Sequence, residues 1–119
     1  MARSMLVISR QSPWSGPSAR EALDMVLAGG AFDLPLGLLF LDDGVFQLLA
    51  GQAPGQLEQK DLTVSLQALS LFGVEQLYAS ASDLARRGIA TNQLGLSVSL
   101  LTDAQLAALI RSHDHVVTL

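Results

Sequence analysis

The sequence predicts an α/β protein: a three-layer α/β/α sandwich around a mostly parallel five-stranded sheet. Short apolar runs alternate along the chain with longer segments of helical periodicity, which is typical of strand–helix–strand units. The first runs are apolar almost throughout, as expected of strands buried on both faces. The 119 residues suffice for one domain only, so residues 1–119 are expected to form a single domain.

The start of the chain predicts a strand and then a helix. Residues 5–8 are a continuous apolar run that ends in a polar loop, which favours a buried strand. Ser18 and Glu21 have the spacing of a capping box at the start of an amphipathic helix. Gly29 and Gly30 are expected to end that helix.

A second strand is expected at residues 36–41, another short and fully apolar run. It ends in Asp42 and Asp43, whose carboxylates are expected to cap the free N–H groups of a following helical turn. Val45, Leu48 and Leu49 share one face of that turn. Gly51 is placed to end it, and residues 52–56 are then a surface loop.

Residues 58–72 fit both a helix and a strand, because apolar residues recur at both spacings. The length favours a helix, since an ordinary strand has only about 5 to 6 residues. This predicted helix has a second apolar stripe of Val64, Ala68 and Leu71, beyond the face that would cover a sheet. The second stripe is a candidate partner interface.

The last third of the chain adds three strands and two helices. The strands are expected at residues 74–79, 96–100 and 115–119. A short helix that ends near Gly88 separates the first two, and a helix with Thr102 and Gln105 at capping-box spacing precedes the last. With right-handed crossovers, this order gives a sandwich of flavodoxin-like general architecture.

Composition limits the function. Only 15% of residues are charged, against about 25% in an ordinary soluble domain, which suggests a permanent protein partner. The formal charge of -4 argues against direct binding to nucleic acid or anionic lipid. No apolar stretch approaches a membrane span, so a soluble, cytoplasmic protein is expected. The chain has no Cys, which excludes thiol chemistry on its own residues.

No catalytic residue, metal or cofactor is expected. The loop at residues 9–16 could cradle a phosphate or flavin, but it lacks a glycine-rich phosphate motif, and its Trp14 better suits a partner interface. Asp42 and Asp43 do not match the acidic positions of response-regulator receivers. His113 and His115 lack the third protein ligand that a catalytic zinc site needs.

Residues 40–54 carry a more specific pattern, Phe-Leu-Asp-Asp-Gly-Val-Phe-Gln-Leu-Leu-Ala-Gly-Gln-Ala-Pro. This run resembles the TusC/DsrF-like sulfur-relay subunits of the DsrE/F family. The sequences around residues 20–24, 73–76 and 86–88 support the resemblance, which extends over nearly the whole chain in element order. Within the motif, we expect Asp43 and Gly44 to form a turn, Phe46 to pack or anchor a partner, and Gln52 to make a polar contact.

The resemblance implies a place in a complex. In proteins of this kind, homologous TusB-like, TusC-like and TusD-like chains form a dimer of heterotrimers. This assembly takes persulfide sulfur from TusA and passes it through the TusD-like chain to TusE, for 2-thiolation of the tRNA wobble uridine. The resemblance therefore implies a non-catalytic TusC-like chain beside TusB-like and TusD-like partners, with the reactive Cys on the TusD-like one. Two alternatives stay open: a DsrEFH-type subunit for sulfur oxidation, and a stand-alone flavin or nucleotide binder.

Overall fold

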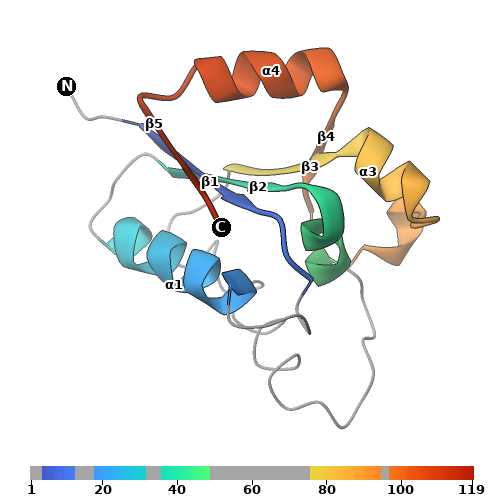
Figure 1. The fold of residues 1–119 in the computed structure, drawn as a ribbon, viewed down its shortest axis with the longest axis horizontal. Helices are drawn as coiled ribbons and strands as arrows, with labels where there is room; N and C mark the ends of the chain where they lie inside the picture. The colour runs from blue at the N-terminus through green and yellow to red at the C-terminus, as the bar shows by residue number, and fades with distance from the viewer. Residues whose placement is uncertain (1–3, 13–17, 32–35, 49–75, 95–96) are drawn as a thin grey trace, which may run out of the picture.

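The computed structural model describes residues 4–12, 18–31, 36–48, 76–94 and 97–119. Its centre is a five-stranded sheet in which every neighbouring pair of strands is parallel (Figure 1). The strand order is β4-β3-β2-β1-β5. The strands are β1 (Met5–Ser9), β2 (Leu36–Phe40), β3 (Gln76–Ser80), β4 (Ser99–Leu101) and β5 (His115–Thr118). The predicted α/β class and five-stranded sheet are confirmed.

The strand order explains why helices lie on both faces. From β1 to β4 the chain steps across the sheet in one direction, and from β4 to β5 it returns past β1. Because crossovers are right-handed, reversing the step reverses the face that the helix covers. Helix α1 (Ser18–Ala31) accordingly lies on one face and α4 (Asp103–Arg111) on the other (Figure 1). Helix α3 (Ala81–Arg86) follows β3.

The two faces are buried to very different extents. The cluster on the α1 face contains twelve buried apolar residues, including Val7 and Phe40. The cluster on the α4 face contains only three: Leu6, Ile8 and Leu39. None of the nine residues of α4 is buried, and its apolar residues Leu106, Leu109 and Ile110 are half-buried against those three. The described chain thus covers its α4 face much less completely than its α1 face.

The predicted end of the first helix is wrong. Helix α1 continues through Gly29 and Gly30 to Ala31. Gly29 packs so closely on the following strand that an added Cβ would lie 2.4 Å from the Leu36 Cδ1 atom. This glycine permits close helix–strand packing instead of ending the helix.

Other boundaries shift at the sheet edge and in the turns. Strand β4 spans Ser99–Leu101, shorter than the predicted 96–100 and displaced toward Leu101. The turn after β2 is a 3₁₀ helix, η1 (Asp42–Leu48), and a second 3₁₀ turn, η3 (Thr91–Gln93), was not predicted. The capping box at Thr102 and Gln105 is confirmed, with both reciprocal hydrogen bonds formed. The predicted helix at 58–72 lies outside the described residues.

Candidate functional site

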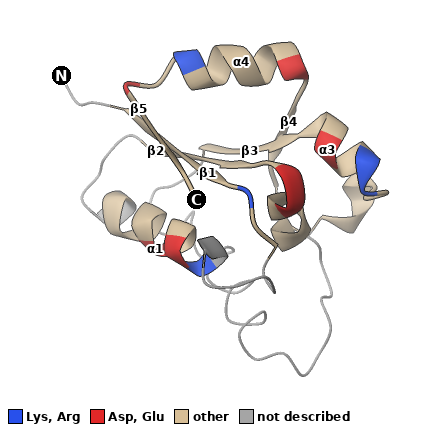
Figure 2. Ribbon diagram, viewed as in Figure 1, with Lys and Arg blue, Asp and Glu red and all other residues tan. Residues whose placement is uncertain are grey.

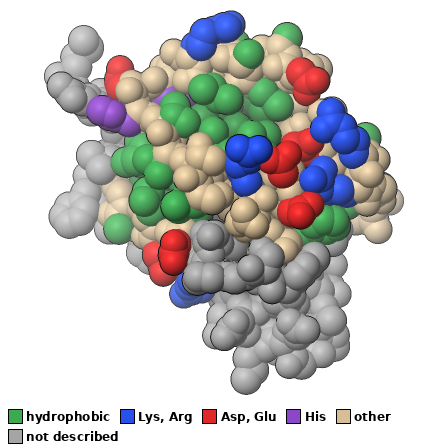
Figure 3. Space-filling model, in the orientation of Figure 1, with side chains coloured by type: hydrophobic (Ala, Val, Ile, Leu, Met, Phe, Trp, Pro, Cys, Tyr) green, Lys and Arg blue, Asp and Glu red, His purple; other side chains and the backbone are tan. Residues whose placement is uncertain are grey.

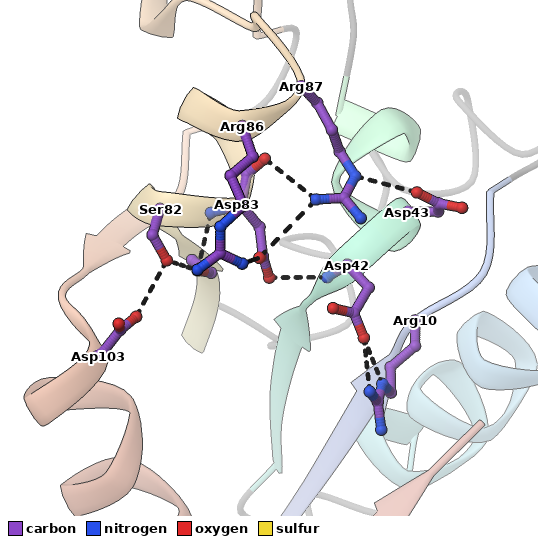
Figure 4. A network of polar contacts seen from close by, with 9 residues as sticks. Arg10, Asp42, Asp43, Ser82, Asp83, Arg86, Arg87 and Asp103 are labelled. Carbon is purple, nitrogen blue, oxygen red and sulfur yellow. Dashed lines mark hydrogen bonds and ion pairs between the residues drawn. The ribbon is translucent and has the colours of Figure 1, made fainter.

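The carboxyl edge of the sheet holds one connected network of polar side chains. All five strands are parallel, so the segments that follow them meet at this edge, where α/β proteins usually place their functional groups. Figure 4 shows the network, whose labelled side chains come from the segment after β1, from η1 after β2, from α3 and its C-terminal end after β3, and from the start of α4. Three arginines and four aspartates take part: Arg10, Arg86, Arg87, Asp42, Asp43, Asp83 and Asp103.

Asp83 is the centre of the network, and its side chain is only 8% exposed. Its Oδ2 atom accepts the backbone N–H of Asp42 at 2.8 Å. Its Oδ1 atom lies 3.0 Å from Arg86 Nη1 and 3.8 Å from Arg87 Nη1. This nearly buried carboxylate connects α3 to the turn after β2, because one of its oxygens accepts the Asp42 N–H while the other pairs with Arg86 and Arg87.

The carboxylates of Asp42 and Asp43 pair with arginines from distant segments. Arg10 donates from Nε to Asp42 Oδ2 at 2.7 Å, and its Nη2 atom forms an ion pair with the same oxygen at 2.6 Å. Arg87 donates from Nε to Asp43 Oδ1 at 3.0 Å. Helix capping was predicted for these two aspartates, whereas the contacts seen here are ion pairs that join η1 to β1 and to α3.

The turn that holds Asp42 has an unusual backbone. Asp42 has a φ of 51°, in the left-handed region that Asp enters more readily than most residues. Two residues later, an added Cβ on Gly44 would lie 2.0 Å from the Ser9 carbonyl oxygen. Only glycine permits this approach of η1 to the end of β1.

Gln47 is a buried polar residue of η1 whose role the sequence patterns did not indicate. It is 3% exposed and donates from Nε2 to Ser9 Oγ at 2.7 Å and to the Gln11 carbonyl at 2.9 Å. The sequence does contain one indication of this role, because Gln47 is a single polar residue in the apolar run of residues 45–49. Gln47 fixes the start of the loop after β1 against η1.

Two serines connect the network to α4. Ser80 is 1% exposed and caps α3 by accepting the Asp83 N–H at 3.2 Å. Its hydroxyl lies 3.1 Å from that of Ser82, which donates to Asp103 at 3.0 Å. The described edge offers hydroxyls, carboxylates and guanidinium groups, whereas the two histidines of the chain, His113 and His115, lie between the end of α4 and the start of β5, at the opposite edge of the sheet.

The predicted site residues fall in two groups. Asp43, Gly44 and Phe46 lie in η1, where Asp43 is in the network and Phe46 is half-buried against the α1-face cluster. Trp14, Gln52, Val64, Ala68 and Leu71 lie outside the described residues. The roles predicted for them as partner contacts stay predictions.

Among the described residues, no three His, Asp or Glu side chains are grouped so that they could hold a metal ion. His113, one of the two histidines considered as metal ligands, instead lies with Nδ1 2.9 Å from the Leu109 carbonyl oxygen. Within the same part of the chain, no helix is long and apolar enough to cross a membrane.

Two solved structures share the fold. The ychN protein of E. coli superposes with a TM-score of 0.79 over all of both chains, at 26% identity. The protein MTH1491 of Methanobacterium thermoautotrophicum superposes with a TM-score of 0.66, also over all of both chains; at 14% identity it supports the fold alone.

The sequence comparisons show the family. A protein named TusC homolog from Pseudomonas aeruginosa is 61% identical over 119 residues and all of both chains. The intracellular sulfur oxidation protein DsrF of Allochromatium vinosum is 33% identical over 94 residues, 79% of this chain and 69% of DsrF. The model of the DsrE/DsrF-like family matches residues 3–119. This chain therefore belongs to the DsrE/DsrF-like family.

Proposed function

We propose that this chain is a non-catalytic member of a sulfur-relay complex, equivalent to the TusC component of a TusBCD-type heterohexamer. Such a complex passes persulfide sulfur toward 2-thiolation of the wobble uridine of tRNA. The observation that carries the proposal is the 61% identity, over the full length, to a protein named TusC homolog. The match to DsrF, at 33% over a shorter stretch, supports the alternative in sulfur oxidation more weakly.

The chemistry of the chain supports a structural role in that relay. A persulfide is held on a cysteine sulfur, and this chain has no Cys. We propose that the sulfur is carried by a TusD-like partner, beside a TusB-like one, with TusA-like and TusE-like carriers meeting the assembled complex. In this proposal the complex is cytoplasmic, and the chain itself contacts neither nucleic acid nor membrane.

The polar network gives this role a physical basis. It joins the ends of three strands and the start of α4 into one edge, held by a nearly buried carboxylate and several long-range ion pairs. A surface that holds partner chains benefits from such preorganisation, because less conformational entropy is lost on assembly.

Co-expression with candidate TusB-like and TusD-like chains tests the proposal. We expect all three to purify in equal amounts, and mass analysis after alkylation to find the persulfide on a partner. Cells that lack this chain should lose 2-thiouridine from their tRNA. Intact tRNA thiolation together with impaired sulfur oxidation would support the DsrF-type alternative instead.

A further inference from the structure

Helix α4 is held to the rest of the described chain by few contacts. None of its residues is buried, whereas α1 places Ala22, Leu23 and Val26 almost completely inside the α1-face cluster. The middle of α4 carries no charge that could form an ion pair with the sheet (Figure 2). Hydrophobic side chains also reach the surface beside α4 in the view of Figure 3. These are the features of an element that opens more easily than the rest of its fold.

The strand residues beneath α4 are, by contrast, almost completely buried. Leu6, Ile8 and Leu39 are each at most 5% exposed. Within the described chain, the only helical residues in their cluster are three half-buried residues of α4. The α1-face cluster contains no residue of α4. Movement of α4 would therefore uncover one face of the sheet while the larger cluster stays packed.

A single side-chain hydrogen bond joins α4 to the polar network. Ser82 donates to Asp103 Oδ1 at 3.0 Å (Figure 4), and in the described ranges no other hydrogen bond connects a residue of α4 to a different helix or strand. Because the one proton of the Ser82 hydroxyl is used in this bond, the Ser80 hydroxyl, 3.1 Å away, must donate to Ser82. Ser80 in turn accepts the N–H of Asp83, so the link continues to the centre of the network.

We propose that α4 opens as a separate unit and that the Ser82–Asp103 bond holds it closed. The opening leaves the α1-face cluster intact and uncovers Leu6, Ile8 and Leu39. Because the bond joins α4 to the polar network, a molecule that binds at this end of the network changes how often α4 is open, and binding to the uncovered strands weakens the bond in return. The opening does not depend on the sulfur relay, so it can hold or fail independently of the function proposed above.

Two neighbouring residues of β2 provide a matched test. Leu38 is 1% exposed on the α1 face, and Leu39 is 0% exposed on the α4 face. Because the chain has no Cys, Leu38→Cys and Leu39→Cys each supply a single buried thiol. With the purified full chain in native buffer, we expect a thiol reagent to label Leu39→Cys at least about tenfold faster than Leu38→Cys. Equal labelling, or slower labelling of Leu39→Cys, would overturn the proposal.

Low concentrations of urea distinguish local opening from global unfolding. The labelling rate of Leu39→Cys should change little with urea, because opening α4 exposes little surface, whereas that of Leu38→Cys should rise steeply. Hydrogen exchange makes the same comparison in the unsubstituted chain. The amides of α4 should exchange faster than those of β2, and equal protection of the two elements would show that α4 leaves only when the whole chain unfolds.

Ser82→Ala tests the link itself. Ser82 lies in α3, so the change leaves the sequence of α4 intact, and Ala suits a helix. In the Leu39→Cys chain, we expect Ser82→Ala to raise the labelling rate by about three- to tenfold, the factor that corresponds to one net hydrogen bond. Ser97→Ala is the control, because Ser97 is exposed and its side chain makes no hydrogen bond in the described chain; its effect should stay below about twofold. An unchanged rate in Ser82→Ala, or an equal rise in both variants, would refute the link.

Discussion

The carboxylate of Asp83 accepts the backbone N–H of Asp42 at 2.8 Å, although 41 residues separate them in the sequence. This bond fixes the start of η1 against the start of α3. Asp42 in turn holds Arg10 at the end of β1, so one buried carboxylate organises three segments of the carboxyl edge.

Asp83→Asn is expected to lower the free energy of unfolding by about 2 to 4 kcal/mol, because it removes a nearly buried charge that Arg86 and Arg87 compensate. Urea denaturation measures the change. Asp24→Asn is the matched control, since Asp24 pairs with Arg20 at an exposed site, and its cost should stay below about 1 kcal/mol. Equal costs for the two variants would show that Asp83 does not organise the edge.

Gly44→Ala is expected to cost more than about 3 kcal/mol, because the new Cβ would overlap the Ser9 carbonyl oxygen and force the backbone to move. Gly88→Ala is the control. Gly88 has a φ of +67° but open space around it, so only backbone strain of about 1 to 2 kcal/mol applies. Thermal unfolding of both variants should rank Gly44→Ala as clearly the less stable, and the reverse order would refute the close approach.

Gln47→Leu should destabilise the chain by about 1 to 3 kcal/mol, although it adds apolar surface to a buried site. The change removes the donor that the Ser9 hydroxyl and the Gln11 carbonyl share. Gln105→Leu, at an exposed capping box, should cost no more than about 1 kcal/mol. A stabilising Gln47→Leu, in chemical denaturation, would mean that the amide is not needed there.

Phe46→Ala separates packing from partner binding. Phe46 is half-buried against the α1-face cluster, whereas Phe40 is fully buried in it. We expect Phe46→Ala to weaken assembly with partner chains by more than about 1 kcal/mol. Its loss of stability should be smaller than the roughly 3 to 5 kcal/mol expected for Phe40→Ala. If the Phe46→Ala variant still co-purifies with the partner chains in unchanged amounts, Phe46 contributes to packing within this chain and not to partner binding.

The sequence predicted the elements whose signals are local. The strands β1 and β2 are short, almost continuous apolar runs, and nearly all of their residues are buried. Such runs are typical of central strands in a parallel sheet that is covered on both faces. The capping box of Thr102 and Gln105 is likewise complete within four residues. By contrast, the local sequence predicts that Gly29 ends the helix, as glycines often do. Its actual role depends on Leu36, seven residues later, which packs against Gly29 only in the folded chain.

The network at the carboxyl edge was not predictable for the same reason. Asp43 and Arg87 are 44 residues apart, and nothing in the local sequence indicates that their loops meet. Their local sequence therefore predicts only that they cap the turn that follows them. Their actual partners follow from the strand order, which places the ends of β1, β2 and β3 side by side.

The mass of the intact complex tests the central claim most directly. The full chain should be co-expressed with its candidate partners, purified through a tag on this chain and weighed by native mass spectrometry. We predict a complex that contains this 12.6 kDa chain with two other family members in equal numbers, one of which carries a Cys that accepts persulfide. Recovery of this chain without those partners, under conditions in which they are expressed and folded, would contradict the account.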